Sequence, residues 1–373
     1  MNTAFPNQIV YPIGNANFPD GFKFSASMAS RQTHGEFSGF YRGFDKHLLR
    51  VGTGYQYIDY YKLEPLAIFG ETVTDLSDSA ASYGRELIRN NWHIFIQDTW
   101  SFLPNWELTA GVRYDEYSDF GNTTNPRLAL VWQTRPNLTT KLLYGQAFRA
   151  PTFNQINDSE SNPFALGNPN LKPETIETWE LAFDYRAAGN LHFGLNLFTY
   201  FIEDKVIFVS EFGNDEIRRA QNVGEQEGQG FELETRWQVT KKIKLLFNYA
   251  FQDSTDKTNN HTVGNAPQHQ VYLRSDWLLI PDWFLNGQVN WIGKRERPFG
   301  DPRDNLEGYT TVDLTLRHKN PQKPWSIAVS VRNLFDEDVR EPSYGPDSSG
   351  IINMPYDIPM AGRSFFGEVR YQF

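Results

Sequence analysis

The sequence contains no cysteine, so neither a disulfide framework nor a thiolate metal site can form. It also has no stretch approaching the roughly 18 consecutive apolar residues that a membrane-spanning helix needs. Basic residues are outnumbered, with 35 Lys and Arg against 45 Asp and Glu and a formal net charge of -10. A nucleic-acid partner would require a basic face. These absences argue against a disulfide scaffold, a helical membrane protein and a nucleic-acid-binding protein.

Patterns of catalytic and metal-binding residues are missing as well. No G-x-S-x-G, H-E-x-x-H or Walker sequence occurs, and the seven histidines stand singly. Two polar runs, 157–160 and 253–256, lack the spacing and the glycine of an EF-hand calcium loop. We therefore expect no enzyme activity, no resident metal and no cofactor.

The N-terminal segment, residues 1–34, is poor in alternation and contains three prolines. We expect a loop-rich segment there, with at most one strand near 22–28. The first residues, MNTAFP, have neither the basic nor the apolar region of a signal peptide.

Aromatic residues are abundant at 15%, although the mean hydropathy is only -0.55. This combination is typical of an outer-membrane β-barrel, in which only alternate residues face lipid and aromatic girdles lie at both interfaces. Alternating segments recur from residue 35 to the end. They predict fifteen strands, at 35–44, 47–58, 91–101, 106–116, 124–133, 138–148, 176–187, 191–202, 228–239, 242–253, 268–278, 283–293, 308–318, 325–333 and 361–373.

The connections between these strands alternate in length. Short turns alternate with long or polar loops, which are 59–90, 117–123, 149–175, 203–227, 254–267, 294–307 and 334–360. A barrel with a periplasmic and an extracellular rim has this arrangement, whereas a soluble sandwich has no reason for it. Within 309–317, Val312 and Leu314 alternate with Asp313 and Thr315, so the first pair is predicted to face lipid and the second the lumen.

One long connection, 149–175, carries a distinctive motif. Arg149-Ala150-Pro151 follows an aromatic strand, and Gly167-Asn168-Pro169-Asn170-Leu171-Lys172-Pro173-Glu174 precedes the next. Near the end, Val331-Arg332-Asn333-Leu334-Phe335-Asp336 leads to a last strand that finishes on Phe373. In combination, these motifs resemble the barrel of TonB-dependent outer-membrane receptors, over about residues 35 to 373.

The resemblance implies an all-β, transmembrane antiparallel β-barrel of the 22-stranded type, of which about 15–16 strands are present. It implies a plug domain and first strands that this sequence does not include, so we expect a fragment of a receptor for energy-coupled nutrient uptake. The implied cargo is a ferric siderophore, with haem, cobalamin or a glycan as alternatives, and a passive porin-like channel is the competing function. The implied partners are outer-membrane lipid and lipopolysaccharide, a TonB-type coupling protein acting through the plug, and the barrel-assembly machinery.

Two groups of candidate residues follow. The motif residues are predicted to be architectural, and they are Arg149, Pro151, Asn168, Pro169, Leu171, Pro173, Glu174, Asn333, Phe335 and Phe373. The candidate ligand residues combine guanidinium groups with aromatic rings in two outer loops, and they are Arg295, Arg297, Phe299, Arg303, Arg340, Tyr344 and Tyr356. Such a surface suits an anionic chelate. The alternative is a solvated charged loop that contacts lipopolysaccharide or neighbouring loops.

Overall fold

The computed structural model describes residues 7–11, 22–69, 72–75, 87–156, 165–211, 214–320, 322–346, 352 and 354–372. Its strands are β1 (Asn7–Tyr11), β2 (Phe22–Tyr41), β3 (His47–Phe69), β4 (Thr72–Asp75), β5 (Leu87–Leu103), β6 (Trp106–Tyr117), β7 (Gly121–Arg135), β8 (Leu138–Arg149), β9 (Ala165–Leu166), β10 (Glu174–Ala188), β11 (Leu191–Glu211), β12 (Asn214–Thr240), β13 (Ile243–Asp256), β14 (His261–Thr262), β15 (His269–Ile280), β16 (Trp283–Ile292), β17 (Tyr309–Lys319), β18 (Trp325–Arg332), β19 (Arg340–Glu341), β20 (Ile358–Pro359) and β21 (Ser364–Tyr371). A single helical turn, α1 (Phe153–Ile156), completes the described elements.

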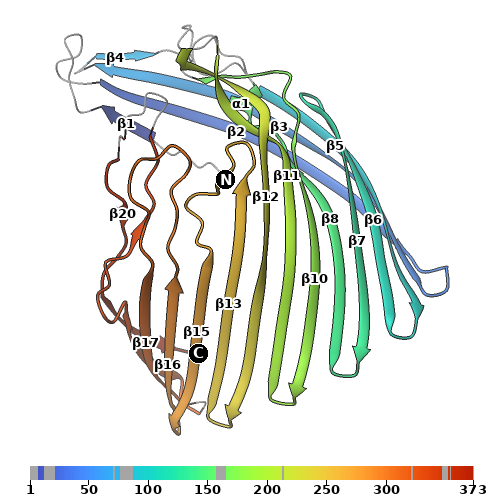
Figure 1. The fold of residues 1–373 in the computed structure, drawn as a ribbon, viewed down its shortest axis with the longest axis vertical. Coiled ribbons are helices and arrows are strands. Elements are labelled where there is room, and N and C mark those ends of the chain that lie inside the picture. Colours follow the sequence, from blue (N-terminus) through green and yellow to red (C-terminus); the bar gives the residue numbers. More distant parts are fainter. Residues whose placement is uncertain are drawn as a thin grey trace.

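The long strands form one continuous sheet in which sequence neighbours pair antiparallel, from β2 and β3 through β5 to β21. Figure 1 shows this sheet as a curved wall, with tight turns along one end of the strands and longer connections at the other. We call these ends the short-turn rim and the long-loop rim. The sequence predicted that the long connections lie together at one end of the strands, and this prediction is confirmed.

The described sheet has two edges. β21 pairs with β18, β2 pairs with β3 and with the short β1, and no pairing among the described residues joins β21 to β1 or β2. The wall is therefore open between its first and last long strands. Unpaired backbone groups at such edges are costly in lipid, since no water is present to satisfy them.

All fifteen predicted strands are confirmed, but several extend further than predicted. β2 begins at residue 22 and runs through the segment expected to be loop-rich, and β3 continues to 69. β11 and β12 extend through most of 203–227, which was predicted to be a loop. These extensions lack the strict alternation of apolar and polar residues on which the prediction depended; in β11, for example, Val206 to Val209 are consecutive apolar residues.

The two faces of the sheet separate as the alternation predicted. Leu314 pairs with Val331, which pairs in turn with Phe365, so apolar side chains lie next to one another on the lipid face. Asp313 pairs with Gln288 on the opposite face, which lines the lumen. The lipid face of the last strands is widely exposed, at 73% for Phe365. This exposure has a physical reason, because lipid covers that face in a membrane.

Asparagine side chains join adjacent hairpins at the short-turn rim. The Asn137 amide donates to the carbonyl of Arg186 at 3.2 Å, and the Asn190 amide donates to the carbonyl of Gln238 at 2.9 Å. Each bond connects a turn to the next hairpin along the wall. Turn residues that form hydrogen bonds to the backbone therefore also fix the spacing of the hairpins.

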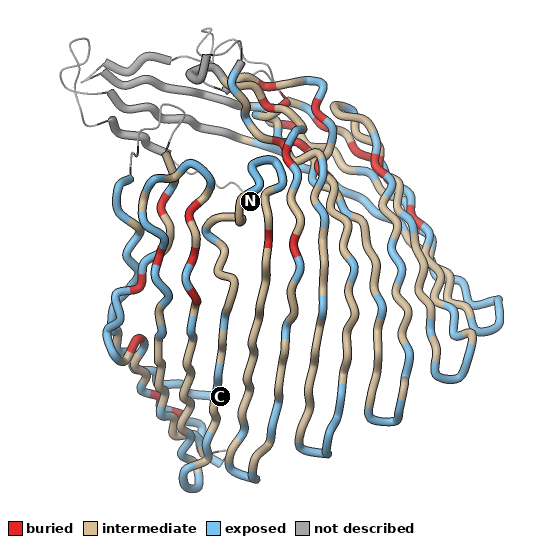
Figure 2. Tube along the Cα trace, viewed as in Figure 1, coloured by how far each residue is buried: buried red, intermediate tan, exposed pale blue. Residues whose placement is uncertain are grey.

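Buried residues are sparse, as expected of a wall one sheet thick. Figure 2 shows intermediate and exposed positions along most of the strand length. One apolar cluster, at the long-loop rim, consists of Ile156, Leu171, Val206 and Ala220, with Phe120 packed against it. No described helix is both long and apolar enough to cross a membrane.

Candidate ligand site at the long-loop rim

The first motif forms an ion pair that joins two strands. The Arg149 guanidinium at the end of β8 donates from Nε to Glu174 Oε2 at 2.7 Å and also contacts Oε1. Glu174, at the start of β10, accepts a further bond from the backbone N–H of Val206 at 2.7 Å. Arg149 and Glu174, both predicted to be architectural, thus join β8 to β10.

The other residues of the first motif make contacts with β11 and β12. Leu171 is 2% exposed and lies in the apolar cluster, and Pro151 is fully buried. The Asn168 amide donates to the carbonyl of Ala220 at 3.0 Å, while Pro169 and Pro173 shape the path between these contacts. These contacts support the architectural role predicted from the sequence.

The second motif closes a turn after β18. Asn333 has a φ of 48°, and its side chain exchanges hydrogen bonds with the backbone of Glu337 at 2.8 Å. Its backbone N–H donates to Asp313 on β17, also at 2.8 Å. Phe335 lies within this turn with its side chain 72% exposed, and Phe373 lies outside the described residues. An asparagine fits here because its side chain tolerates the left-handed conformation and bonds locally.

Arg295 is buried between the two outer loops. It is 3% exposed, and its guanidinium donates to Glu341 Oε2 and to the carbonyl of Arg340, each at 2.6 Å. It also lies 5.5 Å from the ring centroid of Tyr309. Arg340 itself remains outside, where its side chain pairs with the exposed Asp338 at 3.0 Å.

Arg297 and Arg303 complete the connection between these loops. Arg297 is 7% exposed and makes a two-pronged bond with Asp357, both contacts being 2.7 Å. Arg303 pairs with Asp301 and donates to Ser343 Oγ at 2.6 Å. We call Arg295, Arg297 and Arg303, with their acid partners Glu341, Asp357 and Asp301, the rim clamp.

The clamp leaves aromatic rings at the surface. Phe299, Tyr344 and Tyr356 are 64%, 84% and 80% exposed, and we call them the rim aromatics. Arg303 also donates to the carbonyl of Tyr344 at 3.0 Å, so the clamp positions the backbone beside one of these rings. Of the predicted residues, the three clamp arginines bind acids between or within the loops, Arg340 pairs with Asp338 at the surface, and the three aromatic rings remain exposed.

The acid partners of the clamp were not identified from the sequence. Asp357 lies 60 residues from Arg297, and no local spacing connects them. Asp301 is two residues from Arg303, but the loop contains several acids and the sequence does not distinguish among them. The clamp is thus a tertiary feature, created where two loops on neighbouring hairpins meet.

Low pH is expected to open the rim clamp. The Arg303 hydrogen bond holds the pKa of Asp301 below the ordinary 3.8, and the Arg297 hydrogen bond acts on the pKa of Asp357 in the same direction. A depressed pKa contributes stability that is present above the ordinary value and is lost as pH falls through the lowered one. Pepsin cleavage of loop 342–357 should therefore remain slow near pH 4 and rise below it. Slow cleavage down to pH 2 would contradict this, and Asp357→Asn should already be cleaved faster near pH 4.

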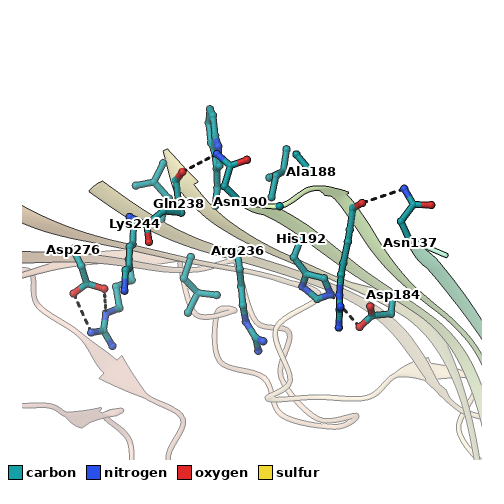
Figure 3. Close-up of a pocket in the computed structure, with 16 residues that line it drawn as sticks. Asn137, Asp184, Ala188, Asn190, His192, Arg236, Gln238, Lys244 and Asp276 are labelled. Carbon is teal, nitrogen blue, oxygen red and sulfur yellow. Dashed lines mark hydrogen bonds and ion pairs between the residues drawn. The ribbon is translucent and has the colours of Figure 1, made fainter. Parts of the chain in front are cut away.

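A concave region lies on the lumen face of the short-turn rim. Its volume is about 1070 Å³, and charged side chains from β10 to β15 project into it, as Figure 3 shows. His192 lies 3.0 Å from Asp184, and Arg274 lies 3.0 Å from Asp276. None of the predicted ligand residues lies here. Within the described ranges, no group of three or more His, Asp or Glu side chains is arranged to hold a metal ion.

The open wall of paired strands, its lipid and lumen faces and its two rims agree with one family of known proteins. The family described as TonB dependent receptor-like, β-barrel matches residues 3–334. The chain belongs to this family. It is therefore a β-barrel chain of the bacterial cell outer membrane, from a family of transport receptors rather than enzymes.

Individual relatives match at lower identity and over part of their length. The iron-regulated outer membrane virulence protein of Vibrio cholerae is 25% identical, over 74% of this chain and 45% of that protein. The metal-pseudopaline receptor of Pseudomonas aeruginosa is 26% identical, over 67% and 37%. A structure of a ferric enterobactin receptor variant from the same organism, in complex with enterobactin, has a TM-score of 0.76 at 20% identity, over 96% and 56%. The chain thus spans about half the length of these relatives.

Proposed function

We propose that this chain forms the C-terminal part of an outer-membrane receptor that takes up a ferric siderophore in an energy-coupled manner. The strands from β2 to β21 form the wall, and the plug and first strands belong to the rest of the receptor. On this proposal the long-loop rim faces the outside and binds the ligand. A TonB-type protein acts through the plug, the barrel-assembly machinery inserts the wall, and lipopolysaccharide surrounds it.

The names of the relatives support a metal-chelate cargo. One is regulated by iron, one is a receptor for metal-pseudopaline, and a protein of similar fold holds enterobactin as a ferric enterobactin receptor. These descriptions belong to those proteins. They favour a ferric siderophore over haem, cobalamin or a glycan as the first ligand to test.

The observation that supports the proposal is the exposure of the rim aromatics on loops that the rim clamp holds together. Phe299, Tyr344 and Tyr356 present rings to solvent from two loops that the rim clamp holds together. Exposed aromatic groups on a fixed framework bind a ligand without a large cost in side-chain ordering. Because the clamp arginines are engaged by acids, we assign them to hold the loops and assign the rings to contact the ligand.

The test is a ligand panel applied to the purified chain. The chain in detergent micelles is titrated with ferric siderophores, haem and cobalamin, and binding is followed by equilibrium dialysis. We expect ferric siderophores to bind, weakly because the implied plug would supply the floor of the pocket. Replacing all three rim aromatics by alanine should reduce that binding at least tenfold.

The matched control is Phe335→Ala. Phe335 is also widely exposed, at 72%, and it lies at the start of the outer loop 334–360, just after β18, but it belongs to neither the rim clamp nor the rim aromatics. This control should leave siderophore binding within about twofold of the parent chain. Equal losses in the two variants, or a preference for haem or cobalamin over every siderophore, would count against the proposal.

A further inference from the structure

A carboxylate lies on the lipid face of the wall. Asp98 on β5 occupies a lipid-facing position, because Ile94 and Ile96 on the same side of the strand are exposed, while the alternate residues from 89 to 95 are buried. Its register partners on the adjacent strands are Leu49 of β3 and Ala110 of β6. A charged side chain that faces lipid among apolar neighbours is costly unless it is paired. The partners of Asp98 therefore decide whether its charge is satisfied.

The pairing of Asp98 within the chain is incomplete. His47 Nδ1, at the first residue of β3, donates to Asp98 Oδ2 at 2.5 Å. The other oxygen, Oδ1, is buried and has no hydrogen-bond partner in the described part of the chain. The Asp98 side chain as a whole remains 33% exposed. An ionised carboxylate offers about four acceptor sites, so Asp98 keeps capacity for further donors on the face that meets the membrane.

Aromatic rings place this ion pair at the membrane surface. His47 stacks on Trp100 with ring centroids 5.3 Å apart, and Trp106 stacks on Trp132 at 4.7 Å. Trp100 and Trp132 are exposed on the lipid face. Tryptophan rings in such positions lie at the headgroup level of a bilayer. Asp98 is two residues further from the turn than Trp100, about 7 Å along the strand, so its carboxylate lies where headgroups meet acyl chains.

An apolar groove begins beside Asp98 and follows the strands toward the middle of the bilayer. Its volume is about 410 Å³. Tyr41 and Leu49 form its outer end, and both lie at the level of Asp98 because Tyr41 pairs with Leu49 and Leu49 pairs with Asp98. Phe37 and Ile94 form its inner end. Tyr41 and Phe37 are four residues apart on β2, so the groove extends about 13 Å along the strands.

Gly39 forms the middle of the groove. A Cβ placed on Gly39 would meet no atom within 4 Å, so the groove is open there. Gly39 lies between Phe37 and Tyr41 on the lipid side of β2, and both of these rings are exposed. A hydrocarbon chain fits such a notch between two aromatic rings, because it gains apolar contact along its length. The groove and Asp98 thus form one continuous site with an apolar length and a polar end.

The turn 42–46 adds charged groups near the polar end. Arg42 and Lys46 are exposed, Lys46 precedes His47 directly, and Asp45 is the only acid in the turn, so the turn carries one excess positive charge. Long basic side chains extend along apolar surface to place their charge at the membrane surface. The site therefore offers partners to both charges of a zwitterionic headgroup, an acid for an ammonium and a net positive charge for a phosphate.

We propose that this groove binds one membrane phospholipid whose headgroup carries a primary ammonium, with the ammonium at Asp98 and an acyl chain over Gly39. A primary ammonium supplies the N–H donors that Asp98 lacks. A quaternary ammonium has the same charge but no donor, and a phosphate with an uncharged polyol has neither. The inference goes beyond the cargo of the receptor, because it requires only that the chain lies in a membrane.

The experiment compares phospholipids that share acyl chains and differ in headgroup. The delipidated chain in detergent micelles is titrated with phosphatidylethanolamine, phosphatidylcholine and phosphatidylglycerol, and native mass spectrometry counts the lipids bound to each chain. We expect one phosphatidylethanolamine to bind about tenfold more tightly than either other lipid, the gain typical of a hydrogen bond to a charged group. Asp98→Asn should remove this preference, because the amide keeps the shape of the side chain and loses its charge.

The matched control for the headgroup is Asp184→Asn. Asp184 also lies near the short-turn rim and also pairs with a histidine, His192, at 3.0 Å, but it faces the lumen. This variant should keep the preference of the parent chain within about twofold. Heat-modifiable gel mobility confirms that each variant is folded.

Gly39→Leu tests the groove separately from the headgroup. The new side chain projects into open space, so it occupies the groove and should weaken the binding of all three lipids at this site about tenfold. Gly35→Leu is the control, because Gly35 lies on the same side of β2, also has open space beside it and is not part of the groove. This control should leave lipid binding within about twofold of the parent chain.

Three results would each overturn the lipid site. They are equal affinity for phosphatidylethanolamine and phosphatidylcholine, equal effects of Asp98→Asn and Asp184→Asn, and equal effects of Gly39→Leu and Gly35→Leu. Dimers in place of lipid-bound monomers would also overturn it, and would assign the groove to a second copy of this chain. Failure of the siderophore proposal leaves all of these outcomes unchanged, because none of them involves a chelate.

Discussion

Replacing Val312 by arginine is expected to prevent much of the chain from assembling in a membrane. Val312 lies on the lipid face of β17 and pairs with Val289, so the new guanidinium would enter the apolar band. A charge at the bilayer midplane costs about 2–4 kcal/mol in such barrels. The measurement is the folded fraction in lipid vesicles, read from heat-modifiable gel mobility against urea concentration.

Thr311→Arg is the control for this substitution. Thr311 is the preceding residue on the same strand, pairs with Asn290 and faces the lumen, where a charged side chain remains hydrated. The same arginine there should change stability by less than about 1 kcal/mol. If the two variants assemble equally well, the assignment of the lipid face is wrong.

Replacing Arg297 by glutamine is expected to detach the two outer loops from each other. The change leaves Asp357 partly buried without its partner, and removing one member of a buried pair costs about 3–5 kcal/mol. Because 1.4 kcal/mol corresponds to a factor of ten, backbone amides of the loop should exchange roughly 100-fold faster or more. Hydrogen–deuterium exchange at Ser343 and Tyr344 measures this directly.

Arg340→Gln supplies the comparison, because Arg340 lies in the same outer loop as the measured amides of Ser343 and Tyr344. Its ion pair with Asp338 is exposed on both sides, and such pairs contribute about 0–1 kcal/mol. Exchange at Ser343 and Tyr344 should therefore change less than tenfold. Similar acceleration in both variants would show that the loop opens without regard to the buried pair, and that the rim clamp does not hold it.

The strands were predictable because their signal is local. On a lipid-exposed strand every second residue must be apolar, so the period of two is present within ten residues, as in the segment from Ile243 to Gln252. The period of two is lost where a strand is no longer required to present every second residue to lipid. β12 continues past Gly228 to Asn214 through a mostly polar stretch without alternation, and nothing local distinguishes that extension from a loop.

The candidate site was predictable only in part. Phe299, Tyr344 and Tyr356 could be selected from composition, as could the arginines beside them. Their division into exposed rings and buried clamp could not, because it depends on an acid 60 residues from its arginine.

The sequence by itself determined the class of the protein, its strands, the face of each strand that meets lipid and the rim that carries the long loops. These features follow from the period of two and from turn chemistry, which act over a few residues. Tertiary structure alone decided which charges are neutralised and which remain free, because that depends on distances between strands and loops far apart in the chain. Arg297 and Arg127 are the same residue type in the sequence. In the structure, Arg297 forms an ion pair with Asp357, whereas Arg127 faces the lumen and has no acid partner among the described residues.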